Sequence, residues 1–214
     1  MPKLYLLGGE NVCKRSAMEV NERAFRDAGE RPAVVVFPWA RASFDGLYRK
    51  RKLLFDYFTS MGAVTVDFVE YMDSKATIEQ KIAASNLIYL TGGLVSALIE
   101  RLRKMEVDDL LRSYRGVIVG RSAGALALCR RCVITPRRSK QVRVVNGLGL
   151  ADLTLKAHYR SRKDVYLLQF SKIEKIYAVP SRSAIVYDDR ILAVIGKVYQ
   201  FEGGRKTRLC SANP

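Results

Sequence analysis

Residues 116–128 read GVIVGRSAGALAL, and this stretch decides how the rest of the chain is interpreted. An apolar run ends at Gly120, and Ser122 stands between Gly120 and Gly124 before a segment rich in Ala and Leu. The order predicts a strand, a sharp turn and a helix, because glycines are needed where strand and helix approach closely as the chain reverses. Such a nucleophile elbow lifts the Ser122 hydroxyl clear of the sheet. The backbone N–H of Ala123 would then face an oxyanion formed by its attack on a carbonyl.

Strands and helices alternate before this stretch. Strands are predicted at 3–7, 33–37, 63–68, 87–90 and 117–119, with helical segments at 14–28, 43–61, 78–84 and 94–114 between them. The uninterrupted β-branched run at 33–37 is typical of a strand covered on both faces. The alternation predicts an α/β fold with a mostly parallel sheet flanked by helices on both faces. With 49% hydrophobic residues, residues 1–214 can bury one core and are expected to form a single domain.

The pattern changes after residue 132. Extended segments are predicted at 142–145 and 153–157, a helix at 163–169, and strands at 176–179, 184–187, 191–195 and 198–201. Asp188-Asp189 and Gly196-Lys197 are short polar connections that predict hairpins between the last three strands. The C-terminal part is therefore expected to add antiparallel strands at one edge of the sheet.

Three glycine-containing turns follow predicted parallel strands. They are Gly8-Gly9, Thr91-Gly92-Gly93 and the 120–124 turn. Functional loops of parallel sheets gather at the carboxyl ends of the strands, so these turns should lie close together. A backbone N–H of Gly92 or Gly93 would then face Ser122 and complete an oxyanion hole with Ala123.

His158 is the only histidine of the chain, so any serine–imidazole pair must use it. It follows the extended segment at 153–157, from whose end an imidazole can project into the crevice beside Ser122. The two residues are therefore the candidate nucleophile and general base.

Several motifs together resemble one family. They are Thr91-Gly92-Gly93, GRSAGA at 120–125, GLGL at 147–150, His158-Tyr159 and AIVYD at 184–188. In this order they resemble the dipeptidase E and cyanophycinase family of serine peptidases, whose fold is that of class I glutamine amidotransferases. The resemblance implies Ser122 as nucleophile, His158 as general base, and Gly93 with Ala123 as oxyanion donors. Members resembling dipeptidase E cleave after an N-terminal aspartate, and cyanophycinases cut an aspartate-arginine polymer.

The chain departs from the pattern of this family at two places. Leu94 follows the glycine pair, where the family usually has asparagine. The family generally places a triad carboxylate ten to fifteen residues beyond the serine, whereas this chain has arginines in and around that span, at 130, 131, 137 and 138. The acid that would orient the imidazole is therefore not at its usual place.

No other acid is an obvious substitute. Asp152 is the only carboxylate between Ser122 and His158. An extended segment at about 3.3 Å per residue places it roughly 20 Å from His158, too far to orient the ring. The sequence leaves the third group open. The candidates are Glu10, Asp164, Asp188, Asp189, a backbone carbonyl or a water.

The chain is strongly basic, with 37 Lys and Arg against 21 Asp and Glu and a formal net charge of +16. Such a charge attracts anions. Because the basic clusters are scattered over different elements, a solvated basic surface is the preferred interpretation, and nucleic acid is a less favoured partner. Arg121, Arg137 and Arg160 are predicted to bind an acidic side chain or carboxylate of the substrate.

Other classes of protein are disfavoured. No stretch approaches the roughly 20 apolar residues of a membrane span, and the first residues do not follow a signal-peptide pattern, so a cytoplasmic protein is expected. Four cysteines are few for a disulfide framework. Cys129 and Cys132 form a C-x-x-C motif without a second pair at zinc spacing. No metal and no cofactor are therefore predicted.

The leading hypothesis is a serine hydrolase resembling dipeptidase E, a monomer or homodimer that cleaves a small peptide or amide, aspartyl peptides included. The alternative is a catalytically weak or inactive relative that uses the fold as a binding module for an acidic partner or nucleic acid. An ordinary α/β-hydrolase esterase fits poorly, because only 36 residues separate Ser122 from His158 and no suitable acid stands between them.

Overall fold

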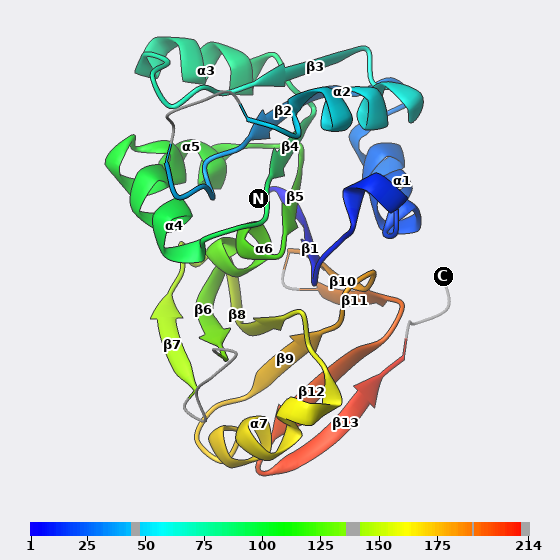
Figure 1. Ribbon diagram of the computed structural model, residues 1–214, viewed down its shortest axis with the longest axis vertical. Helices are drawn as coiled ribbons and strands as arrows, with labels where there is room; N and C mark the ends of the chain where they lie inside the picture. The colour runs from blue at the N-terminus through cyan, green and yellow to red at the C-terminus, as the bar shows by residue number, and fades with distance from the viewer. Residues whose placement is uncertain (44–47, 136–141, 190, 211–214) are drawn as a thin grey trace.

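The computed structural model describes residues 1–43, 48–135, 142–189 and 191–210. It contains two β-sheets with helices around them (Figure 1). The first sheet has seven strands in the order β11-β10-β1-β5-β4-β2-β3, and the second has six in the order β13-β12-β9-β8-β6-β7. The predicted α/β fold class is confirmed. The prediction of a single domain over residues 1–214 stays a prediction.

The first sheet is mostly parallel, as predicted. Its parallel strands are β1 (Lys3–Leu7), β5 (Val117–Arg121), β4 (Leu87–Leu90), β2 (Ala33–Phe37) and β3 (Thr65–Phe68). Beside β1, the strands β10 (Ala184–Asp188) and β11 (Ile191–Ile195) run antiparallel and form one edge. These two strands confirm part of the predicted antiparallel C-terminal edge.

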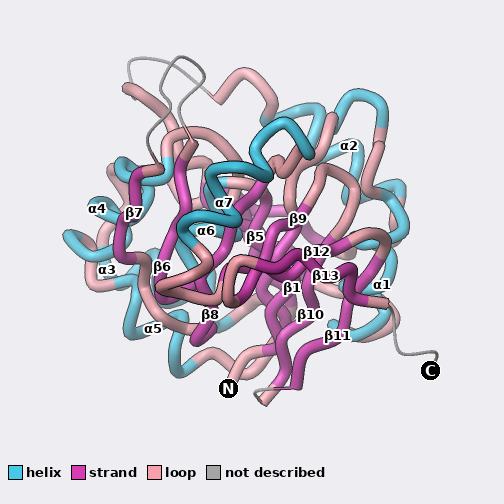
Figure 2. The backbone as a smooth tube through the Cα atoms, turned by 90° about the horizontal axis from the view of Figure 1, so that it is seen from below, coloured by secondary structure: helices cyan, strands magenta, loops and turns pink. Residues whose placement is uncertain are grey.

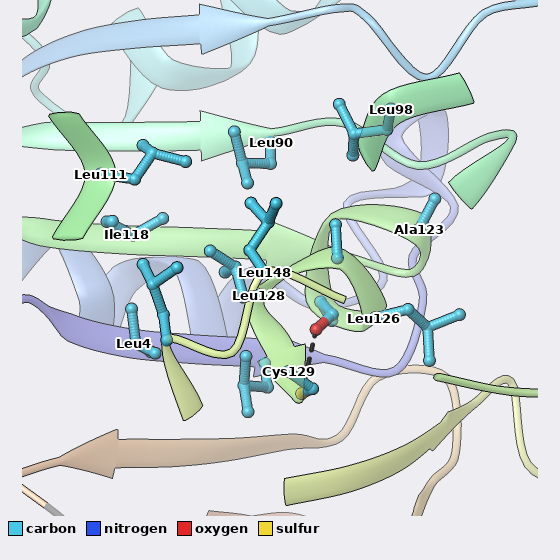
Figure 3. Packing of buried hydrophobic residues seen from close by; sticks show 14 of the residues in the cluster. Leu4, Leu90, Leu98, Leu111, Ile118, Ala123, Leu126, Leu128, Cys129 and Leu148 are labelled. Carbon is cyan, nitrogen blue, oxygen red and sulfur yellow. Dashed lines mark hydrogen bonds between the residues drawn. The ribbon is translucent and has the colours of Figure 1, made fainter. Parts of the chain in front are cut away.

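Helices cover both faces of this sheet because successive strand residues point to opposite sides. One face packs against α1 (Met18–Ala28) and α2 (Arg51–Ser60), with Tyr5 and Val36 buried beside Phe25 and Phe58. The other face packs against α3 (Lys75–Ala83), α4 (Val95–Lys104), α5 (Val107–Ser113) and α6 (Ala123–Leu128). Figure 3 shows leucines of β1, β4, α4 and α6 in this second core layer. No described helix has the length and apolarity that crossing a bilayer requires.

The second sheet corrects the prediction for the C-terminal part. Its strands are β6 (Cys129–Ile134), β7 (Arg143–Asn146), β8 (Ala151–Ala157), β9 (Ile176–Val179), β12 (Val198–Glu202) and β13 (Arg205–Leu209). Strands β6, β8 and β9 run parallel, and the other three pair antiparallel with their neighbours. The segments predicted at 176–179 and 198–201 thus belong to this sheet and not to the edge of the first. Gly196-Lys197 closes no hairpin, because β12 pairs with β9 and β13.

The second sheet begins directly at the end of α6. At the end of the helix, Leu148 N–H donates to Ala127 O at 2.7 Å, and Gly149 N–H donates to the carbonyl of Cys129, the first residue of β6, at 3.1 Å. Cys129 Sγ also donates to a carbonyl of α6 (Figure 3). The chain therefore passes from helix to strand without a connecting loop. The short helix η2 (Ser161–Lys163) and helix α7 (Asp164–Phe170) follow β8 and lie over the second sheet (Figure 2).

Candidate active site

Ser122 occupies the predicted sharp turn between β5 and α6. Its backbone has φ 54° and ψ −102°, in the positive-φ region that non-glycine residues rarely adopt. The turn is held because Ser122 N–H donates to Leu7 O of β1 at 2.9 Å. Its glycines are required: a Cβ at Gly120 would lie 2.6 Å from Ala125 N, and one at Gly124 would lie 2.4 Å from Leu90 O. The strand-turn-helix prediction is confirmed.

His158 comes from the other sheet, directly after β8. It also has a positive φ, 50°, and its N–H donates to Gly8 O at 2.8 Å. The carboxyl end of β8 therefore meets the carboxyl end of β1, where Ser122 is also held. The structure brings the two predicted residues together: His158 Nε2 lies 2.7 Å from Ser122 Oγ.

The second ring nitrogen of His158 faces a residue that the sequence did not single out. His158 Nδ1 lies 3.1 Å from Ser181 Oγ, in the loop between β9 and β10. A loop serine carries no pattern that marks it as a partner of a distant histidine. The sequence predicts a carboxylate or a backbone group at this nitrogen, and it does not predict Ser181.

The acids considered as substitutes have other partners. Glu10 accepts from Tyr57 Oη at 3.0 Å, and Asp152 pairs with Arg130 Nε at 2.6 Å. Asp164 pairs with Lys206 and Asp188 with Lys3, at 2.8 and 3.7 Å. Within the described ranges, neither these carboxylates nor that of Asp189 is hydrogen-bonded to His158.

The glycine pair after β4 lies against Ser122. A Cβ at Gly92 would lie 3.2 Å from Ser122 Cβ. Gly93 has φ +154°, and a Cβ there would lie 2.0 Å from Ala40 O, so only glycine fits this turn. Ala123, the third predicted oxyanion residue, is the first residue of α6. The three predicted positions thus adjoin the serine.

Ser122 and His158 line a cavity of about 660 Å³ to which four basic residues also belong. The side chains of Lys156, Arg160, Arg162 and Lys163 all contribute to it, and no Asp or Glu belongs to the lining described by the structure. A cavity of this charge favours an anionic ligand. Apolar residues also line the cavity, among them Val95, Leu126 and Val133, and Leu94, beside Gly93, is 53% exposed.

Lys156 is the least exposed of the basic residues in the cavity wall that the structure describes, at 8%. It lies on β8 two residues before His158 and lines the same cavity, and its Nζ donates to Ala157 O at 2.6 Å. Burial, together with the positive charge of Lys163, lowers the pKa of Lys156 to about 8. The ammonium is therefore charged at neutral pH and loses its proton in mildly alkaline solution.

The surroundings of His158 favour the neutral form of its imidazole. Desolvation is the largest cause that lowers the pKa of His158 below its usual value, followed by the positive charges of Lys156, Arg121 and Arg160. A neutral ring with a free Nε2 lone pair is the form that accepts a proton. The site thus favours the general-base form at neutral pH.

The three arginines predicted for substrate binding differ in where they lie. Arg121 is only 6% exposed and is absent from the cavity lining, because its side chain turns among Tyr48, Tyr89 and Glu10. Arg121 is therefore a buried cation next to Ser122 in the chain, and its part in substrate binding stays a prediction. Arg160 lines the cavity as predicted, and Arg137 lies outside the described residues.

The comparisons with known proteins agree on one class. A peptidase from an acI-B1 actinobacterium has a similar structure, with a TM-score of 0.72 and 18% identity over 100% of this chain and 96% of the other. A putative peptidase E protein from Listeria monocytogenes EGD-e aligns with a TM-score of 0.68 and 18% identity over 91% and 98% of the chains. No curated protein matches the sequence. The profile of peptidase family S51 matches residues 4–195. The chain therefore belongs to peptidase family S51, which confirms the resemblance to the dipeptidase E family of serine-type peptidases.

Proposed function

We propose that this peptidase hydrolyses small peptides or amides that carry an acidic group close to the scissile bond, with Ser122 as nucleophile and His158 as general base. The observation that supports this most directly is the 2.7 Å contact between Ser122 Oγ and His158 Nε2 at the wall of a basic cavity. This is the distance over which a serine proton passes to an imidazole.

The reaction would proceed through an acyl-enzyme. His158 Nε2 takes the proton of Ser122 as Oγ attacks the carbonyl carbon, and the tetrahedral intermediate carries the negative charge on oxygen. The imidazolium then gives this proton to the leaving nitrogen as the C–N bond breaks. The same ring then takes a proton from a water molecule as that water attacks the ester carbonyl. The acyl C–O bond breaks, the imidazolium returns its proton to Ser122 Oγ, and the acid product leaves.

The oxyanion would be bound by the backbone N–H groups of Ala123 and of Gly93 or Gly92. Ala123 begins α6, and the N–H groups of a first helical turn have no partner within the helix. The glycine turn supports this assignment because it adjoins Ser122 on the side of the cavity. Removing one such donor from a serine hydrolase costs about 10²–10³ in turnover.

The charge of the cavity supports an acidic substrate. Arg160 and Lys156 line it together with the Ser122–His158 pair, so a substrate carboxylate can reach a cation while its carbonyl lies against the serine. A guanidinium pairs with a carboxylate through two parallel hydrogen bonds, which fixes orientation as well as charge. An aspartyl dipeptide is the simplest substrate of this kind.

A fluorophosphonate probe tests the nucleophile, and a pair of substrates tests the specificity. The wild type should be labelled and Ser122→Ala should not. Asp-Leu should be hydrolysed faster than Asn-Leu, which has nearly the same shape but lacks the side-chain carboxylate. Arg160→Gln should raise KM for Asp-Leu and leave KM for Asn-Leu within about twofold. A labelled Ser122→Ala variant, or equal rates for the two dipeptides, would contradict the proposal.

The formal charge of +16 favours a second candidate function, in which the protein is a binding module for an acidic macromolecule. Retention on a polyanion that falls steeply with salt, combined with no labelling of the wild type by the probe, would favour that function.

Location in the cytoplasm and a monomeric or dimeric state remain predictions. Fractionation of cells and sedimentation of the purified chain test them.

A further inference from the structure

The Ser181 hydroxyl lies where a serine peptidase normally holds an acid. The ring of His158 has Ser122 Oγ at one nitrogen, 2.7 Å away, and Ser181 Oγ at the other, 3.1 Å away. The three groups form one continuous chain of hydrogen bonds. No carboxylate in the described part of the chain joins it.

The chemistry of the ring fixes the direction of these hydrogen bonds. Nε2 must carry a lone pair to take the proton of Ser122, so in the neutral ring the hydrogen stands on Nδ1. Nδ1–H then donates to Ser181 Oγ. A hydroxyl oxygen accepts this bond as a carboxylate would, but it brings no negative charge.

The loop that carries Ser181 is fastened to the same turn that holds His158. Arg182 N–H donates to Gly9 O at 2.8 Å, next to the Gly8 O that accepts from His158 N–H. A Cβ at Gly8 would lie 2.2 Å from Pro180 O, so the two segments touch through their backbones. The distance between Ser181 and the imidazole is thus set by main-chain contacts on both sides.

We propose that Ser181 is the positioning residue of a Ser122–His158–Ser181 triad, in which a neutral hydroxyl holds the Nδ1–H tautomer and the orientation of the ring. The inference rests on the proposed function. An uncharged acceptor stabilises the imidazolium less than an aspartate does, so the ring keeps a low affinity for protons. The lowered pKa of His158 agrees with this arrangement.

Kinetics of three variants test the role. Ser181→Ala should lower kcat about three- to tenfold, the value of one neutral hydrogen bond, with KM within about twofold. This loss is far smaller than the roughly ten-thousandfold effect of replacing a triad aspartate by its amide. Ser181→Thr keeps the hydroxyl and should restore kcat. Ser181→Asp places a carboxylate beside Nδ1–H and should move the acid limb of the rate profile upward by about one pH unit or more.

A second measurement does not depend on catalysis. Because His158 is the only histidine, ¹⁵N NMR of the imidazole reports one ring, its tautomer and its pKa. The wild type should show the Nδ1–H tautomer, Ser181→Ala should show a mixture of tautomers, and Ser181→Asp should raise the pKa. Ser113→Ala, which removes an exposed hydroxyl at the end of α5, is the matched control and should change nothing.

The outcomes separate the two proposals. A tautomer and pKa that are identical in the wild type, Ser181→Ala and Ser181→Asp would overturn the role of Ser181, as would an unchanged kcat in Ser181→Ala. A wild type that neither reacts with the fluorophosphonate probe nor hydrolyses dipeptides would overturn the proposed function. In that case the NMR result still decides whether Ser181 orients the ring.

Discussion

The imidazole of His158 occupies the space where any residue other than glycine at position 9 would place its Cβ. A Cβ built on Gly9 would lie 2.1 Å from Cε1 and 2.4 Å from Nδ1 of the ring. Gly9 also has φ +150°, a conformation that residues with a side chain rarely adopt. The turn after β1 thus leaves the space that the imidazole occupies, and its Gly8 carbonyl accepts the backbone N–H of His158.

Gly9→Ala should therefore inactivate the enzyme by displacing the ring. A catalytic group moved by about 1 Å loses about a hundredfold in rate, so kcat for a dipeptide should fall by about this factor or more. Gly29→Ala is the matched control, since Gly29 has φ +118° but nothing lies within 4 Å of its Cβ position. Both variants share the backbone strain, so an equal loss of kcat in the two would refute the steric explanation.

The pH dependence of the rate should follow the lowered pKa of His158. The reaction needs the neutral ring, so kcat/KM falls as the pH drops through the pKa of the free enzyme. Because desolvation and nearby cations lower this pKa, the acid limb should lie below pH 6.5, the usual value. Arg160→Gln removes one of these cations and should move the limb upward. The measurement uses Asn-Leu, for which Arg160→Gln should leave KM nearly unchanged, and a wild-type limb above pH 6.5 would contradict the expectation.

The first half of the fold could be predicted because its signals are local. Apolar runs such as 33–37 end at turns, and the glycines on both sides of Ser122 indicate a sharp turn between a strand and a helix. The second sheet could not be predicted in the same way. Its strand β6 follows α6 without a turn residue, and β6 pairs both with β7, the next strand in the sequence, and with β8, the one after it. Only the packing of the whole core decides that Cys129–Ile134 leaves the helix and becomes a strand.

The site shows the same division between local and distant information. Ser122 stands in a motif, and His158 could be found because no other histidine exists. Ser181 could not be found, because its meeting with His158 depends on β8 and β9 being parallel neighbours. The different positions of Arg121 and Arg160 also depend on which way each side chain turns, and the sequence does not show this.

Thiol labelling should distinguish the two kinds of cysteine. Cys129 and Cys132 are buried, their Sγ atoms donate to carbonyls of α6, and burial raises the pKa of Cys132 to about 12 and that of Cys129 well above its usual value. Thiolate is the reactive form, so both should resist a disulfide reagent in the folded protein. Cys13 and Cys210 are exposed and should react quickly. Rapid reaction of all four thiols without unfolding would contradict the burial of the C-x-x-C motif.

Deprotonation of Lys156 at alkaline pH should weaken the binding of a substrate that carries a carboxylate side chain. Its ammonium is charged at pH 7 and neutral above its pKa of about 8, so KM for Asp-Leu should rise as the pH passes this value, while KM for Asn-Leu stays constant. Lys156→Met keeps the unbranched shape without the charge and should raise KM for Asp-Leu at pH 7 about tenfold, the effect of one charge-assisted hydrogen bond. Lys156→Arg should keep KM low and constant to pH 9, because a guanidinium does not lose its proton in this range.

Thermal unfolding of both variants controls for misfolding. Lys156→Met should not be less stable than the wild type, since burial of the ammonium costs free energy. If KM of Lys156→Met for Asp-Leu equals that of the wild type across this pH range, Lys156 does not bind the substrate carboxylate.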